Sequence, residues 1–170
     1  MATDAYSFLF LIPESEAPQG PLDLEHDPEL QALYQKHCEG EYRFTSTSRG
    51  AYVETWAMDH LDTLPGLKYI TRPAVLLGHE DIALALDSLE AAFGVVAQTP
   101  EQEFHGFTGY PIAQALLDTD DELCRRSPGE GADPYYLIMC LRAHRDVLMQ
   151  ANRTASLALY FSFHPYFDSE

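Results

Sequence analysis

The chain has 170 residues, the length of one ordinary domain, and 46% of them are hydrophobic, which suffices for a core and argues against global disorder. Its 27 acidic and 10 basic residues give a formal net charge of −17, which disfavours free nucleic acid and anionic membrane surfaces as partners. Three cysteines without paired spacing indicate reduced thiols. No segment resembles a secretory signal or a membrane span. We therefore expect a cytoplasmic protein with a single domain over residues 1–170.

The first third of the chain predicts a strand, a helix and a hairpin. Residues 5–12 form a short aromatic-rich run that is typical of a buried strand. Asp27 and Pro28 are the N-cap and first residue of a helix that runs to about residue 39. Residues 41–46 and 51–56 both alternate polar and apolar side chains across a turn-like segment, so they predict a β-hairpin.

The remainder of the chain is predicted to be mainly helical. Residues 67–71 are a candidate for another strand, and residues 79–97 carry a clear apolar stripe at helical spacing. A third helix is expected over residues 111–126, and a fourth over residues 135–151, which is apolar almost all round in its first half. Residues 154–163 alternate strongly and predict a final strand.

This order of elements predicts an α+β domain. Because strands and helices do not alternate regularly, a doubly wound parallel sheet is disfavoured. We expect a mixed or antiparallel sheet of about four to five strands, with about four helices packed mainly on one face. The first and last strands are candidates for neighbours in that sheet.

No local motif for catalysis, metal binding or nucleotide binding is present in the chain. Cys140 and His144 are four residues apart on a predicted helix, which is half of a zinc site, but no second ligand pair accompanies them, so packing in the core is the better interpretation. No catalytic residue, metal site or cofactor is therefore predicted. A dispersed acid–base site remains an alternative, and its histidine candidates are His60, His79, His105 and His144.

Two acidic clusters are the candidate partner-binding sites. The denser one consists of Asp118, Asp120, Asp121 and Glu122. It can be a solvated helix face, a surface that meets Lys and Arg of a partner, or a calcium site, although the spacing of an EF-hand is absent. The second cluster lies early in the chain and consists of Asp23, Glu25, Asp27 and Glu29. If the two clusters share a face, they form one broad negative patch.

These features favour a binding protein over an enzyme. The function we expect is an acidic module of the immunity or inhibitor type, which neutralises a basic partner such as a nuclease toxin or another nucleic-acid-binding protein by charge mimicry. Such a module binds no nucleic acid itself and needs no catalytic residues. The alternatives are a small hydrolase-like enzyme with a dispersed carboxylate and histidine site, and an adaptor or scaffold subunit that docks through the aromatic tail, residues 164–170.

Overall fold

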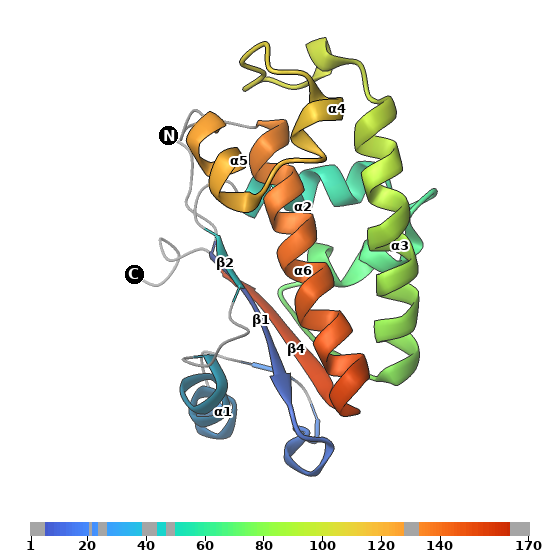
Figure 1. The fold of residues 1–170 in the computed structure, drawn as a ribbon. Coiled ribbons are helices and arrows are strands. Elements are labelled where there is room, and N and C mark those ends of the chain that lie inside the picture. The colour runs from blue at the N-terminus through green and yellow to red at the C-terminus, as the bar shows by residue number, and fades with distance from the viewer. Residues whose placement is uncertain are drawn as a thin grey trace.

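The computed structural model describes residues 6–20, 22–23, 27–38, 44–46, 50–127 and 133–163. Glu25 and the aromatic tail lie outside these residues. The described part forms an antiparallel sheet of order β2-β1-β4-β3 with helices around it, which confirms the α+β class (Figure 1). Its strands are β1 (Tyr6–Ile12), β2 (Phe44–Ser46), β3 (Ala74–Leu77) and β4 (Leu157–Phe163).

The two central strands come from distant parts of the chain. β1 pairs with β4 along its whole length, from Tyr6 opposite Phe163 to Ile12 opposite Leu157. The suggested neighbour relation between the first and last strands is therefore correct. Because side chains alternate along a strand, Leu9 faces one core while Phe10 faces another.

Three helices cover one face of the sheet. They are α2 (Gly50–Asp59), α3 (His79–Gln98) and α6 (Pro134–Thr154), together with the 3-10 helix η2 (Pro65–Thr71). α1 (Pro28–Cys38) lies on the other face, beside β1 (Figure 1). The short helices are η1 (Glu14–Glu16), η3 (Glu101–Glu103), α4 (Ile112–Ala115) and α5 (Asp120–Arg126).

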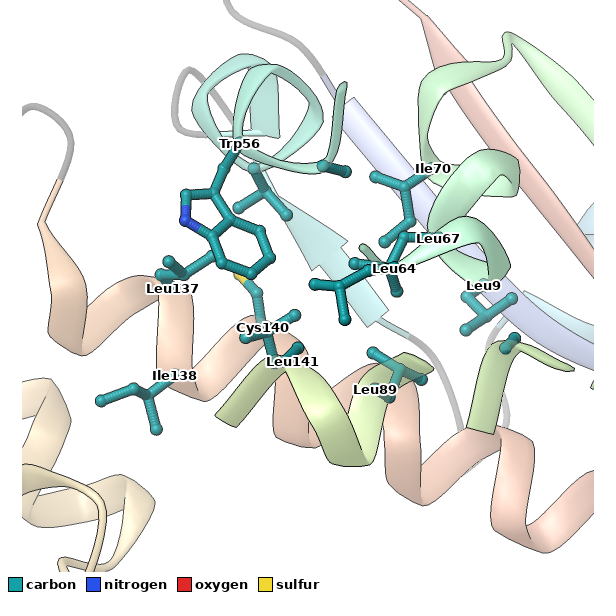
Figure 2. Close-up of a cluster of buried hydrophobic side chains, with 14 of the residues drawn as sticks. Leu9, Trp56, Leu64, Leu67, Ile70, Leu89, Leu137, Ile138, Cys140 and Leu141 are labelled. Atoms are coloured by element: carbon teal, nitrogen blue, oxygen red, sulfur yellow. The ribbon is translucent and has the colours of Figure 1, made fainter. Parts of the chain in front are cut away.

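The main core fills the space between the sheet and these three helices. Leu9 of the sheet, Leu64 and Leu89 are fully buried in it. In Figure 2 the ring of Trp56 on α2 points toward α6, where Cys140 is also buried. Burial of Cys140 agrees with the interpretation that this cysteine packs in the core.

A smaller, aromatic core lies on the opposite face of the sheet. It is built from Phe8, Phe10, Ile12, Leu157, Leu159 and Phe161. The rings of Phe10 and Phe161 stack across the strand pair with centroids 6.0 Å apart. Leu33 of α1 packs against this core, so the sheet is covered on both faces, with the two longest helices, α3 and α6, on the face opposite α1.

The predicted hairpin is wrong, because residues 51–56 belong to α2. Val53, Trp56 and Ala57 are all buried, and this i, i+3, i+4 spacing is the apolar stripe of a helix. The predicted strand at residues 67–71 is wrong as well, since Pro65 opens a 3-10 helix there. Two of the expected strands are thus helical, so the sheet contains fewer of the predicted strands than expected.

Two further differences concern the second half of the chain. The helix predicted over residues 111–126 is interrupted, because Thr119 starts a new helix through a capping box with Glu122. β3 was not predicted, and it forms the edge of the sheet beside β4. Its four residues follow Pro73 directly, and a run this short carries no periodicity that distinguishes a strand.

Replacing Ala155 by glycine is expected to stabilise the protein. Ala155 ends α6 in the left-handed conformation, with φ of 52° and ψ of 35°, which costs energy for any residue with a Cβ atom. We expect Ala155→Gly to raise the free energy of unfolding by about 0.5–1 kcal/mol in urea titrations. The matched change Ala91→Gly, on the exposed side of α3, should lower it by about 1 kcal/mol. A loss of stability in both variants would contradict the expectation.

Candidate functional site

Most carboxylates of the denser acidic cluster form hydrogen bonds or ion pairs within the protein. Glu122 completes the capping box of α5, where its Oε2 accepts a hydrogen bond from the backbone N–H of Thr119 at 2.8 Å. Asp120 accepts a hydrogen bond from Arg142 on α6 at 3.2 Å. The same guanidinium donates to the backbone carbonyls of Leu116 and Asp118, so it binds the whole α4–α5 turn to α6.

Asp118 is also paired internally. Its Oδ2 is buried and accepts no hydrogen bond from the described residues, and the Nε of Arg126 lies 3.3 Å away as an ion partner. The guanidinium of Arg126 in turn lies over the ring of Tyr110, 3.5 Å from its centroid. This geometry holds the Asp118 carboxylate against its own domain.

The net charge at the denser cluster is therefore small. Its four carboxylates lie beside three arginines, which are Arg125, Arg126 and Arg142. Asp121 is exposed and forms no ion pair within the part of the chain that the structure describes. Charges that neutralise one another locally attract a basic partner weakly.

The early acidic cluster lies elsewhere on the molecule. Asp27 caps α1, and its Oδ1 accepts a hydrogen bond from the backbone N–H of Glu29 at 2.9 Å. Asp23 is exposed in the preceding loop. Figure 1 places α1 and α5 far apart, near opposite ends of the sheet, so the described residues of the two clusters do not form one patch.

A cavity of about 280 Å³ is the better candidate site. One wall is a single face of α2 and the turn that follows it, formed by Tyr52, Thr55, Trp56, Asp59 and His60. Their spacing of three and four residues is that of neighbours on a helix surface. The other wall comes from the segment after α3 and consists of Thr99, Glu103, Phe104 and His105.

The aromatic part of the cavity is rigidly held. Trp56 and Phe104 are each only 6% exposed, so most of each ring is anchored in the core. The imidazole of His60 stacks on the Trp56 indole with ring centroids 4.3 Å apart. Its Nδ1 lies 2.7 Å from the Trp56 carbonyl oxygen, which can only accept, so Nδ1 carries the proton and Nε2 of the neutral ring has a free lone pair.

The charged part of the cavity is uniformly acidic. Asp59 and Glu103 are exposed carboxylates at its two walls. The two segments that form the cavity, residues 50–63 and 99–111, contain five acidic residues and neither Lys nor Arg. Unlike the cluster on α5, the segments that form this cavity contain no arginine that could neutralise their carboxylates.

Tyr52 adds a hydroxyl group that stays protonated. Burial and the negative charge of Asp133 both raise the pKa of Tyr52 well above its usual value. Asp133 is itself fully buried at the start of α6, where its carboxylate accepts hydrogen bonds from the backbone N–H of Tyr136 at 2.7 Å and from the hydroxyl of Ser127 at 2.9 Å. The hydroxyl of Tyr52 is therefore available as a neutral hydrogen-bond donor or acceptor beside the cavity.

The histidines named as acid–base candidates separate into three places. His60 and His105 meet in the cavity. His79 is exposed at the start of α3 and lies 3.5 Å from a carboxylate oxygen of Glu14. His144 is buried in the main core, far from solvent. Among the described residues, no three His, Cys, Asp or Glu side chains are grouped so that they could hold a metal ion.

Neither family models, curated proteins nor solved structures give a match. Within the described residues, every helix is too short or too polar to cross a lipid bilayer.

Proposed function

We propose that the protein is an acidic binding module for a basic protein, and that the cavity between α2 and the segment after α3 accepts one arginine or lysine side chain of that partner. The observation that carries the proposal is the pairing of aromatic walls, Trp56 and Phe104, with two carboxylates, Asp59 and Glu103, in segments that lack basic residues. A cation gains from both, through the ring faces and through charge-assisted hydrogen bonds.

The size of the cavity favours a single side chain over a drug-sized ligand. Sites that enclose drug-sized ligands commonly measure about 300–1,000 Å³. The volume of about 280 Å³ falls just below that range and suits one long side chain. Arginine is a frequent anchor in protein interfaces, because its planar guanidinium stacks on aromatic rings and binds carboxylates through two hydrogen bonds.

The overall charge supports the same class of partner. A formal net charge of −17 attracts a basic protein over long range and speeds its association. An inhibitor or immunity-type protein that occupies the basic cleft of a nuclease is the example we favour. In that case the cavity supplies the specific contact, and the remaining acidic surface supplies the long-range attraction.

The cavity can be tested with an isosteric pair of small probes. We expect Nα-acetyl-arginine amide to shift the NMR signals of Trp56, His60 and Glu103 in a saturable way, with a Kd of about 1–10 mM. The citrulline analogue, which has nearly the same shape and no charge, should bind at least about tenfold more weakly.

Matched variants locate the effect on the protein. Asp59→Asn combined with Glu103→Gln should weaken binding of the arginine probe at least about tenfold. Asp120→Asn combined with Asp121→Asn also removes two negative charges, but from the cluster on α5, and should change the Kd of the arginine probe less than about twofold. Equal losses in the two double variants would show unspecific attraction and overturn the proposal, as would equal binding of the citrulline analogue.

A second candidate function is supported by His60. Its Nδ1–H donates to a backbone carbonyl, which leaves the Nε2 lone pair of the neutral ring for the role of a general base, and Glu103 lines the same cavity. If the protein is a hydrolase of this kind, a panel of chromogenic ester, phosphate and glycoside substrates should reveal turnover that His60→Gln abolishes. The same change at His79, outside the cavity, should leave the turnover unchanged. Absence of turnover, or equal turnover in His60→Gln, contradicts this candidate.

A further inference from the structure

A second cavity, of about 180 Å³, opens at the edge of the sheet between η2, β3 and the beginning of α3. Its apolar walls include Val75 and Leu77 of the edge strand and Leu84 of α3. Leu84 is 48% exposed. The cavity therefore presents an aliphatic surface to solvent.

Two basic side chains, Lys68 and Arg72, lie at this aliphatic surface. In the described part of the chain, neither of them forms an ion pair, although the protein has an excess of carboxylates. Lys36, Arg126, Arg142 and Arg145 are each paired with a carboxylate. The exposed Arg125 and Arg153 also form no ion pair within the described residues, but they line neither of the two cavities. Two unpaired cations beside an apolar cavity can bind an anion that carries a hydrocarbon group.

We propose that this cavity binds a small aliphatic monocarboxylate. Lys68 and Arg72 bind the carboxylate, and Val75, Leu77 and Leu84 contact the hydrocarbon. Asp81 also lines the cavity, so two positive charges and one negative charge leave a net charge of +1, which matches a monoanion better than a phosphate ester with two charges. A volume of 180 Å³ accommodates a branched chain of about the size of a leucine side chain.

The position of the cavity is fixed by close packing behind it. Gly66 lines its inner end and donates a backbone hydrogen bond to the buried hydroxyl of Ser88 on α3 at 2.8 Å. Tyr69 lines it as well, and its hydroxyl oxygen lies 2.6 Å from Nδ1 of the buried His144. Because these contacts hold η2 against α3 and α6, the cavity is preformed, and binding a ligand requires little reorganisation of the protein.

The probe for this site is 4-methylpentanoate, followed by the amide signals of Gly66, Arg72 and Val75 in NMR titrations. We expect saturable shifts with a Kd of about 1 mM, as for a ligand of this size. Two control compounds should each bind at least about fivefold more weakly. 4-Methylpentan-1-ol lacks the negative charge of the carboxylate, and acetate lacks the branched hydrocarbon chain.

Variants of exposed, unpaired bases allow the test without loss of folding. Lys68→Gln combined with Arg72→Gln should abolish saturable binding of 4-methylpentanoate. Arg125→Gln, which removes an exposed base on α5 outside the cavity, should leave the Kd unchanged. The proposal is overturned if the double variant, shown to be folded by its unchanged dispersed spectrum, still binds the acid, or if the alcohol binds as tightly as the acid.

Discussion

Acidification from pH 7 to pH 5 is expected to lower the free energy of unfolding by about 2 kcal/mol through His144 alone. This histidine is 1% exposed in the main core between Tyr69 and Tyr160. Burial lowers the pKa of His144 from 6.5 to about 3. In the unfolded chain the imidazole takes up a proton below pH 6.5, while in the folded protein it stays neutral until about pH 3, so the unfolded state gains stability as the pH falls.

Urea titrations at pH 5, 6 and 7 measure this effect. His144→Gln should lower stability at pH 7, because it disturbs a packed site, but it should remove about 2 kcal/mol of the decrease between pH 7 and pH 5. The exposed His105→Gln serves as the control and should retain the steep dependence of the wild type. The same decrease in wild type and His144→Gln would mean that the folded protein binds a proton at this site.

The second large effect is expected at Gly66. A Cβ atom on this residue would overlap the backbone carbonyl oxygen of Leu84 and lie 2.6 Å from the hydroxyl oxygen of Ser88. Because the first of these atoms belongs to the backbone of α3, η2 and α3 must separate to admit a methyl group. We expect Gly66→Ala to lower the free energy of unfolding by about 3 kcal/mol or more.

The matched control lies on the same helix. Gly94 is exposed on α3, and a Cβ atom there meets no other atom within 4 Å. Gly94→Ala should raise stability by about 0.5–1 kcal/mol, because alanine favours the helix. In thermal unfolding the Gly66 variant should melt about 6–12 °C below wild type, with the Gly94 variant slightly above it. A loss below about 1 kcal/mol at Gly66 would show that η2 and α3 adjust easily.

Long periodic segments could be predicted from the sequence, and short ones could not. The helix at residues 79–98 repeats the helical spacing of apolar residues several times, and the strand at residues 157–163 repeats the two-residue alternation of a strand. Such repetition leaves little chance of mistaking a helix for a strand. Residues 51–56 are too few to separate the periods, because Val53 and Trp56 agree with a helical stripe while the alternation around them suggests a strand. The Thr119–Glu122 capping signature was present and would have divided the helix predicted over residues 111–126.

The candidate site was harder to predict than the fold, because its parts are distant in the sequence. The acids on α5 are conspicuous as a local cluster, but Arg142, which binds Asp120, comes 22 residues later. The cavity joins α2 to a segment about 40 residues downstream, and no local motif links them. Reading residues 50–59 as a helix would have placed Tyr52, Trp56 and Asp59 on one face and given the first indication of the site.

The order of the strands has a consequence for synthesis of the protein. β4 lies between β1 and β3, so before residues 157–163 exist the sheet consists of the β1–β2 pair and an isolated β3. During translation the aromatic side chains of β1 therefore lack their main partner until nearly the whole described chain has been made. Closing a loop of this length is slow, and the waiting strand is exposed to other chains. We expect ribosome-bound chains that stop before residue 157 to remain sensitive to protease and to depend on chaperones.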